Sequence, residues 1–354
     1  MRRWKGKSMQ IQAGKWNRLC LCLIVLALAV SAALTYAVDP FEHYRESRIL
    51  PLYDQESYNN PGIARNYDYN AVILGTSMIE MSMPSVIDAC FSVSSVKLPM
   101  RGSHTSQMGW QLSHILAKRP LKLAILAVDA YSLMGPPDDD EEIIRYLWDD
   151  DPFNDVSYLL NRDVLLVKTP RMLRNRGLSL EGKRDSMYQW TDIVFSEQSV
   201  LKAVQFQEQE EMQPADSRIE RSTENINRHL LSAIQAFPQT RFLIYMPPYS
   251  VGYWYMMTRG GLSEQQFRSR LRVCELLLSC PNVEIYDFSS KTEWIENLSE
   301  YFDYSHHSTK ISNELIKAMA RGENRVWTRE DMEKGNEVIR LAVNRFIDKY
   351  EPKH

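Results

Sequence analysis

The stretch 19–38 constrains this chain more than any other part of it. It reads LCLCLIVLALAVSAALTYAV, twenty positions without a charge. At a rise of ~1.5 Å per residue, a helix of that length spans the ~30 Å hydrocarbon core of a bilayer. Six basic residues and no acidic residue precede it. The excess of positive charge predicts that positions 1–18 form a cytoplasmic tail and that the rest of the chain lies outside the plasma membrane.

A cleaved signal peptide is the alternative interpretation of the same run, with Thr35-Tyr36-Ala37 as a weak cleavage site. The run is longer than the ~7–15 residues of a usual signal-peptide core, which favours a retained single-pass anchor. No later apolar run approaches this length. We therefore expect one transmembrane helix over 19–38 and an extracytoplasmic remainder.

The overall composition is that of an ordinary globular protein, with 44% hydrophobic and 25% charged residues. The chain has 354 residues and a net charge of −3. Its length suits one large α/β domain beside the anchor. The charge supplies no basic field for nucleic acid, so we expect no nucleic-acid partner.

The five cysteines point to neither a disulfide framework nor a metal site. Cys20 and Cys22 lie in the apolar run, which leaves Cys90, Cys274 and Cys280 outside it. Three thiols form at most one internal disulfide, and a Cys274–Cys280 pair and buried free thiols both remain open. No metal-ligand spacing is present, so we expect no cofactor.

Beyond the anchor, the chain alternates between short apolar runs and helical patterns. Residues 39–69 are aromatic, polar and broken by proline, and predict an ordered connecting arm. Five apolar runs then end in turn residues, at 71–75, 93–99, 121–130, 241–248 and 282–289. Helical patterns cover 104–119, 224–237, 263–279, 308–321 and 329–349.

This alternation predicts a three-layer α/β/α flavodoxin-like domain over 70–354, with a mostly parallel sheet covered on both faces. Residues 133–223 interrupt the alternation and predict a long, partly helical insertion over the strand ends. Open sheets of this kind carry their sites beyond the carboxyl ends of the strands.

That rule singles out Ser77, which follows the first predicted strand by two residues in the stretch AVILGTS. A serine hydroxyl is a poor nucleophile until a nearby base takes its proton, and a carboxylate commonly orients that base. Asp303 and His306 lie three residues apart in a short polar loop before a helix. The loop follows the last predicted strand, so we expect it at the same sheet edge as Ser77. Taken alone, the Asp-x-x-His spacing also fits a capping aspartate with surface histidines.

A Gly-x-Ser after the first strand, followed late in the chain by Asp-x-x-His, resembles the SGNH/GDSL hydrolase superfamily. The resemblance covers most of residues 70–320. It implies that Ser77 is the nucleophile, His306 the base and Asp303 its orienting acid. It also implies an oxyanion hole formed by the backbone N–H groups of Ser77 and Gly102, since such donors stabilise a developing oxyanion.

Two positions depart from the pattern of that superfamily. Thr76 replaces the usual aspartate, which is not the nucleophile. The Gly-x-Asn-Asp block is missing, and the third predicted strand instead delivers Asp129, where an amide donor is expected. An ionised carboxylate there repels an oxyanion, so Asp129 binds substrate, stays protonated or orients another group. The candidate substrate-binding residues are Thr76, Asp129, Tyr249, Ser250 and His307. For Tyr249 and Ser250, the alternative role is to form a rigid loop that packs an aromatic side chain.

With its anchor and outward domain, the chain also resembles membrane-anchored SGNH-like proteins of Gram-positive bacteria. These include the DltD proteins of teichoic-acid D-alanylation and the polysaccharide O-acetylation partners of membrane-bound O-acyltransferases. The resemblance implies acyl transfer to or from a cell-envelope glycopolymer, with a membrane-bound O-acyltransferase as partner.

The leading hypothesis is therefore a membrane-anchored serine acyltransferase or esterase acting on acetyl or D-alanyl groups. A non-catalytic envelope-binding or assembly protein on a degenerate scaffold is the main rival, favoured by the missing asparagine block. A metal-dependent hydrolase using Asp303, His306 and His307 is a third alternative, which lacks an evident further ligand cluster.

Overall fold

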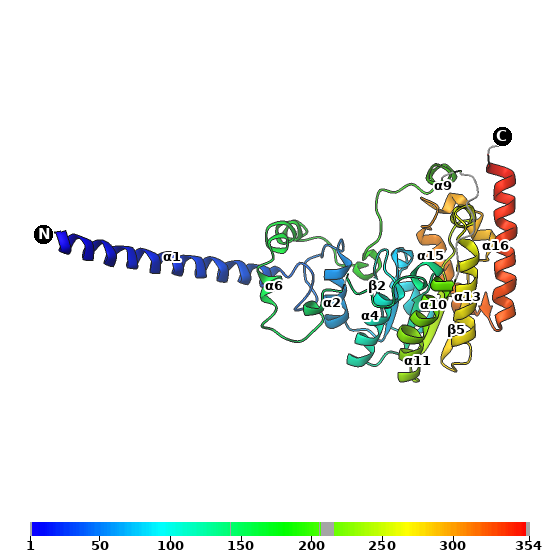
Figure 1. Cartoon of the computed structure of the whole chain (residues 1–354), viewed down its shortest axis with the longest axis horizontal. Coiled ribbons are helices and arrows are strands. Elements are labelled where there is room, and N and C mark those ends of the chain that lie inside the picture. The colour runs from blue at the N-terminus through cyan, green and yellow to red at the C-terminus, as the bar shows by residue number, and fades with distance from the viewer. Residues whose placement is uncertain (1, 142, 205, 207–215, 352–354) are drawn as a thin grey trace. The chain divides into compact units, whose positions relative to one another are not determined.

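The computed structural model describes residues 2–141, 143–204, 206 and 216–351. The chain is an α/β protein with a six-stranded sheet and an apolar N-terminal helix. It divides into two compact units: unit 1 comprises Met1–Asn66 and Ile144–Glu181, and unit 2 comprises Tyr67–Ile143 and Gly182–His354. Most of the predicted arm and the centre of the predicted insertion thus fold together in unit 1 (Figure 1).

The sheet lies within unit 2 and has the strand order β2-β1-β3-β4-β5-β6. Its five parallel strands are β1 (Ala71–Gly75), β2 (Ser95–Pro99), β3 (Leu123–Ala127), β4 (Arg241–Met246) and β5 (Val283–Asp287). Strand β6 (Arg325–Val326) pairs antiparallel with β5. The predicted α/β class with a mostly parallel sheet is confirmed.

Each of the five apolar runs forms one of the parallel strands. Every residue of β1, β2 and β3 is buried, as expected when both faces of a sheet are covered. In register, Val72 of β1 lies level with Val96 of β2 and Ala124 of β3. Strand β6 was not predicted, because two residues are too few to show a periodicity.

All five helical patterns form helices in unit 2. They correspond to α4 (Thr105–Lys118), α13 (Ser263–Leu277), α15 (Thr309–Arg321), α16 (Arg329–Tyr350) and the continuous stretch α10 (Asp216–Asn225), η4 (Ile226–Leu231) and α11 (Ser232–Ala236). The other helices of unit 2 are η1 (Ser77–Ile79), α3 (Pro84–Phe91), α5 (Ala130–Leu133), α8 (Lys183–Ser186), α9 (Glu197–Ala203), α12 (Val251–Arg259), α14 (Thr292–Ile295) and η5 (Leu298–Glu300).

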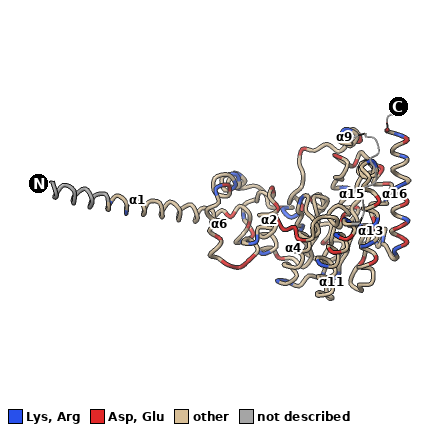
Figure 2. Tube along the Cα trace, in the orientation of Figure 1, with Lys and Arg blue, Asp and Glu red and all other residues tan. Residues whose placement is uncertain are grey.

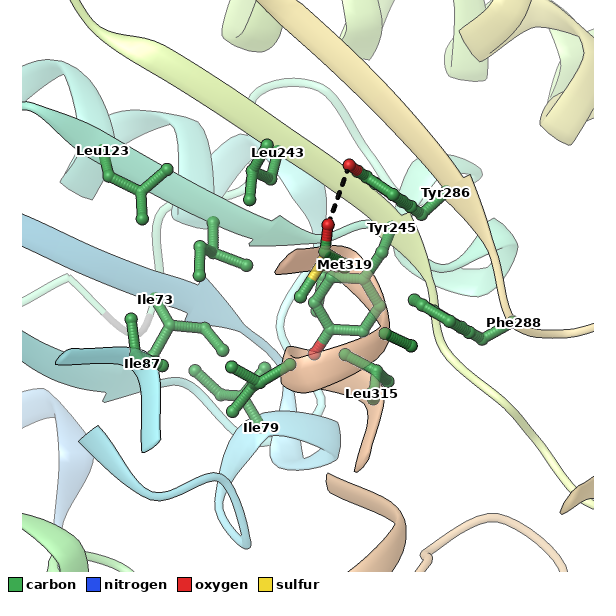
Figure 3. Packing of buried hydrophobic residues seen from close by; sticks show 14 of the residues in the cluster. Ile73, Ile79, Ile87, Leu123, Leu243, Tyr245, Tyr286, Phe288, Leu315 and Met319 are labelled. Carbon is green, nitrogen blue, oxygen red and sulfur yellow. Dashed lines mark hydrogen bonds between the residues drawn. The ribbon is translucent and has the colours of Figure 1, made fainter. Parts of the chain in front are cut away.

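Helices α3 and α15 pack against one face of the sheet and close a fully buried core. Figure 3 shows side chains from these helices gathered against those of the strands, and the Tyr286 hydroxyl donates a hydrogen bond of 3.1 Å to the Met319 carbonyl. Helix α15, which contributes to this core, begins directly after the loop that carries Asp303 and His306. Core packing therefore fixes where that loop ends.

Unit 1 contains the long helix α1 (Arg2–Val38), together with α2 (Glu56–Asn66), η2 (Arg145–Leu147), α6 (Val156–Leu159), η3 (Val164–Lys168) and α7 (Thr169–Leu173). Among the helices of the described ranges, only α1 is long and apolar enough to cross a membrane, over Gly14–Val38. This helix is either a membrane anchor or a signal sequence.

The C-terminal end of α1 is hydrogen-bonded into the rest of unit 1 through Asp39. The Asp39 carboxylate accepts the backbone N–H groups of His43, Tyr44 and Arg45 at 2.9–3.2 Å, and the Tyr158 hydroxyl at 3.0 Å. Its own N–H donates to the Thr35 carbonyl at 2.8 Å. The 39–45 stretch therefore folds as a hydrogen-bonded continuation of the helix end.

The three cysteines outside α1 are free thiols in the structure. Cys274 is buried on α13, and Cys90 and Cys280 are partly buried. The Cys274–Cys280 disulfide that the sequence left open is not formed.

Candidate functional site

Ser77 stands just beyond the carboxyl end of β1, at the first position of the short helix η1. Strand β1 lies between β2 and β3, so Ser77 occupies the point where the strand order reverses. A Cβ atom at Gly75 would lie 2.7 Å from the Ala127 Cβ and 2.9 Å from Ile79 Cγ2. Only glycine therefore lets β1, β3 and η1 approach closely enough to turn the chain into Ser77.

His306 and Asp303 lie in the loop between η5 and α15. An isolated bridge between Tyr301 and His307 closes this loop, and the Phe302 N–H donates to the His306 carbonyl at 3.2 Å. Ser308 then caps α15 by accepting the backbone N–H of Ile311. The loop is thus a closed turn fixed at both ends.

The structure brings Ser77, His306 and Asp303 into one hydrogen-bonded relay. Ser77 Oγ lies 2.8 Å from His306 Nε2, although the two residues are 229 positions apart. His306 Nδ1 lies 2.8 Å from Asp303 Oδ2. Both distances fall within the ~2.6–3.2 Å expected of a nucleophile, a base and its orienting acid.

The second carboxylate oxygen of Asp303 is held by the loop itself. Asp303 Oδ1 accepts the backbone N–H of Ser305 at 2.7 Å and that of His306 at 2.8 Å. Burial alone would raise the pKa of Asp303, but the hydrogen bond and charge of His306 and the two N–H donors outweigh it and lower that pKa. The carboxylate is therefore ionised at neutral pH and able to stabilise an imidazolium.

Two aromatic rings surround the imidazole of His306. Phe302 stacks on it with a centroid separation of 5.3 Å and an interplanar angle of 9°. Trp190 meets it edge-on, at 4.7 Å and 83°. These contacts leave the His306 side chain 23% exposed and that of Asp303 27% exposed. The imidazole is thus restrained by packing and still partly exposed to solvent.

The sequence provided no evidence for Trp190. It lies in the predicted insertion, in a segment of unit 2 without helical or strand periodicity. Downstream, the Ser196 N–H donates to the Tyr301 carbonyl at 3.0 Å, and Phe195 meets Phe302 edge-on at 6.2 Å. This segment therefore runs along the loop that carries Asp303 and His306.

The two backbone N–H groups expected in the oxyanion hole belong to Ser77 and Gly102. Gly102 is exposed in the turn after β2 and has a φ of +63°, which favours glycine. Within the described part of the chain, neither N–H donates to a protein acceptor. Both are available to a negatively charged oxygen.

Asp129 caps the short helix α5 and contacts the residue before the serine. Its carboxylate accepts the Ser132 N–H at 2.8 Å and the Thr76 hydroxyl at 3.4 Å. The side chain is almost completely buried, and this burial raises the pKa of Asp129 to about 6. Asp129 and Thr76 therefore contact each other within the protein interior, directly before Ser77.

The remaining sequence candidates have mainly internal contacts. Ser250 donates its hydroxyl to the Tyr304 carbonyl at 2.7 Å, and Tyr249 stacks on Tyr253 at 4.2 Å. His307 is buried, with Nδ1 lying 3.1 Å from the Ser312 hydroxyl, and burial lowers its pKa to about 4. These contacts match the rigid-loop alternative for 249–250 and leave His307 neutral at pH 7.

The metal alternative finds no ligand set among the residues that the structure describes. No three histidine, cysteine or acidic side chains gather there as metal ligands would. Both ring nitrogens of His306 already contact Ser77 and Asp303.

No protein-family model matches this chain, and neither does any curated protein. The fold and the geometry of the site are therefore the evidence on which a function must be argued.

Proposed function

We propose that this protein is a membrane-anchored serine acyltransferase or esterase of SGNH type. It acts on acetyl or D-alanyl groups of a cell-envelope polysaccharide or teichoic acid. The observation that carries the proposal is the relay from Ser77 through His306 to Asp303, with 2.8 Å at each step. Both the resemblance of the sequence motifs and the position at the switch in strand order support it.

In the proposed reaction, Ser77 Oγ attacks the carbonyl carbon of an acyl ester while His306 Nε2 takes the hydroxyl proton. Asp303 stabilises the resulting imidazolium and keeps it oriented. The C–O bond of the ester then breaks, and the imidazolium returns its proton to the departing alcohol. A second hydroxyl, from a sugar, a polyol or water, resolves the acyl-enzyme by the reverse sequence.

The carbonyl oxygen gains negative charge when Ser77 attacks. The unpaired N–H groups of Ser77 and Gly102 suit this charge, and removing one such donor in other enzymes costs about 3–4 kcal/mol of transition-state stabilisation. An Asn side chain, expected from the resemblance, is replaced by the buried Asp129. The proposed oxyanion hole therefore consists of backbone donors.

The contacts of α1 favour a retained anchor over a cleaved signal peptide. Cleavage after Ala37 would remove Thr35, which is buried, and Tyr36, whose ring packs on that of Tyr44 at 4.7 Å. Exposed Trp16, before the apolar run, and exposed Tyr36, near the end of it, lie about 30 Å apart along the helix, as aromatic residues do at the two interfaces of a membrane. The partner that the resemblance implies is a membrane-bound O-acyltransferase.

A fluorophosphonate probe, which reacts with activated serines, tests the proposal. Wild-type protein should be labelled, and Ser77→Ala should not. Ser85→Ala, which removes an exposed hydroxyl on α3, is the matched control and should be labelled like the wild type. Labelling that persists in Ser77→Ala would refute the assignment of the nucleophile.

A non-catalytic envelope-binding protein is the second candidate. The observation in its favour is Asp129, a carboxyl group at the position where the resemblance calls for an amide donor. This candidate predicts a wild-type protein that binds glycopolymer but neither reacts with the probe nor releases acetate or D-alanine from it. Probe labelling that depends on Ser77 would argue against it.

A further inference from the structure

We propose that the segment 164–180 of unit 1 is a membrane-surface element that lies in the headgroup layer around the outer end of α1. This inference rests on α1 being a retained membrane helix and is independent of the chemistry at Ser77. It concerns unit 1 alone.

The charge and polarity of this segment suit an anionic lipid surface. Its sequence, VLLVKTPRMLRNRGLSL, contains four basic residues and no acidic one. Figure 2 marks these basic residues in blue along the segment after α6. Lys168 and Arg171 pair with Asp54 at 2.8 and 3.0 Å, whereas Arg174 and Arg176 are exposed and have no acidic partner in the described part of the chain. Two cations are thus available to lipid phosphates.

The helical part of the segment exposes apolar side chains where a water-facing helix has polar ones. Val164, Lys168 and Met172 form its buried face, at helical spacing. Leu166, on the opposite side, is 65% exposed, and its neighbour Val167 is 44% exposed. Leu178 and Leu180 are also exposed. Among the described residues outside α1, more than half of the exposed large hydrophobic side chains lie between Phe153 and Leu180. Exposed hydrophobic side chains are therefore concentrated in this region.

The contacts with α1 place the segment at the depth of the bilayer surface. Both η3 and α7 contact α1. Of the described side chains of α1, those that are buried or partly buried are Ser31, Ala32, Thr35 and Val38. Ser31 lies seven residues before the helix end, about 10 Å along the axis. If the apolar run spans the bilayer, elements packed there lie within the outermost ~10 Å, where interfacial helices bury their apolar face.

A bilayer is the occupant that explains the three observations together. Its hydrocarbon boundary covers the leucines, its phosphates pair with the free arginines, and α1 holds the segment at the required depth. A soluble partner would account for the apolar face but not for its position beside a membrane-spanning helix.

Photo-crosslinking of the full-length protein in lipid nanodiscs tests the inference. The photoreactive amino acid p-benzoylphenylalanine replaces Leu166, and lipid adducts are identified by mass spectrometry. Leu28, 47% exposed in the middle of the span, is the positive control. Leu341, 55% exposed on α16 of the other unit, is the matched control for an exposed leucine. We expect lipid adducts at positions 166 and 28 that clearly exceed those at 341.

Charge reversal gives an independent measurement. The double variant Arg174→Glu, Arg176→Glu should decrease adducts at position 166 severalfold in nanodiscs that contain phosphatidylglycerol, and should leave adducts at position 28 unchanged. An absence of adducts at 166 while 28 is labelled would overturn the inference, as would crosslinks at 166 to protein alone. An absence at 28 would refute the anchor on which it rests, and Ser77 labelling by fluorophosphonate reports separately on the proposed enzyme.

Discussion

Replacing Asp303 with asparagine separates the catalytic role of this side chain from its structural role. Asp303 Oδ1 accepts two backbone N–H groups of its own loop, while Oδ2 accepts the His306 Nδ1 proton. An asparagine retains a carbonyl oxygen for the two backbone donors. Its NH₂ group, however, faces His306 Nδ1, which must then be unprotonated to accept from it.

The imidazole proton consequently moves to Nε2, the nitrogen that lies 2.8 Å from Ser77 Oγ. A protonated Nε2 cannot take the serine proton. In serine proteases the equivalent change of tautomer decreases kcat by about 10⁴-fold, or ~5 kcal/mol. We expect a decrease of similar order in the rate of fluorophosphonate labelling of Asp303→Asn.

The structural cost of the same substitution should be small. The two backbone bonds persist, so the free energy of unfolding should change by less than about 1 kcal/mol. Asp303→Ala removes the acceptor of two backbone donors and should cost about 1–3 kcal/mol of stability as well as activity. Chemical denaturation and labelling rates, measured on both variants, distinguish the two effects. If Asp303→Asn is labelled within tenfold of the wild-type rate, Asp303 does not orient the base.

Three other substitutions test the surroundings of the relay. Trp190→Ala removes the ring that lies 4.7 Å from the His306 ring. An aromatic pair is worth about 0.5–1.5 kcal/mol, so the labelling rate should fall roughly two- to thirteenfold. An unchanged rate would show that Trp190 does not restrain the imidazole. Gly75→Ala places a methyl group 2.7 Å from the Ala127 Cβ. Overpacking of this kind should lower the free energy of unfolding by about 1–3 kcal/mol in denaturant titrations. An unchanged free energy of unfolding would contradict the requirement for glycine at this turn. Burial raises the pKa of Asp129 to about 6, so the folded state binds its proton more tightly than the unfolded state. This contribution to stability is complete below about pH 4 and is lost as the pH rises through 6. Asp129→Asn should abolish this decrease in stability with rising pH. Unfolding curves of both proteins at pH 4 to 7 should therefore show a difference in the free energy of unfolding that changes with pH. A difference that stays constant over this range would refute the raised pKa of Asp129.

Much of the fold is encoded by local patterns. Short runs of Val, Ile and Leu that end in turn residues identified all five parallel strands, since a strand covered on both faces needs an almost continuous apolar sequence. The apolar run 19–38 likewise required a helix long enough to span a bilayer. Asp303 and His306 could be paired from sequence because a spacing of three residues brings them together within one turn of chain.

Tertiary structure alone decided the rest. The approach of Ser77 to His306 depends on the strand order and on the packing of α15 against the sheet, which are set by contacts between segments distant along the chain. The position of Trp190 also depends on tertiary contacts, because its segment has no periodicity that indicates where it packs. Unit 1 depends on them as well, since residues 144–181 pack with a helix more than a hundred positions earlier in the chain. Local propensity determines which elements form, whereas burial of their apolar faces against one another determines which side chains meet.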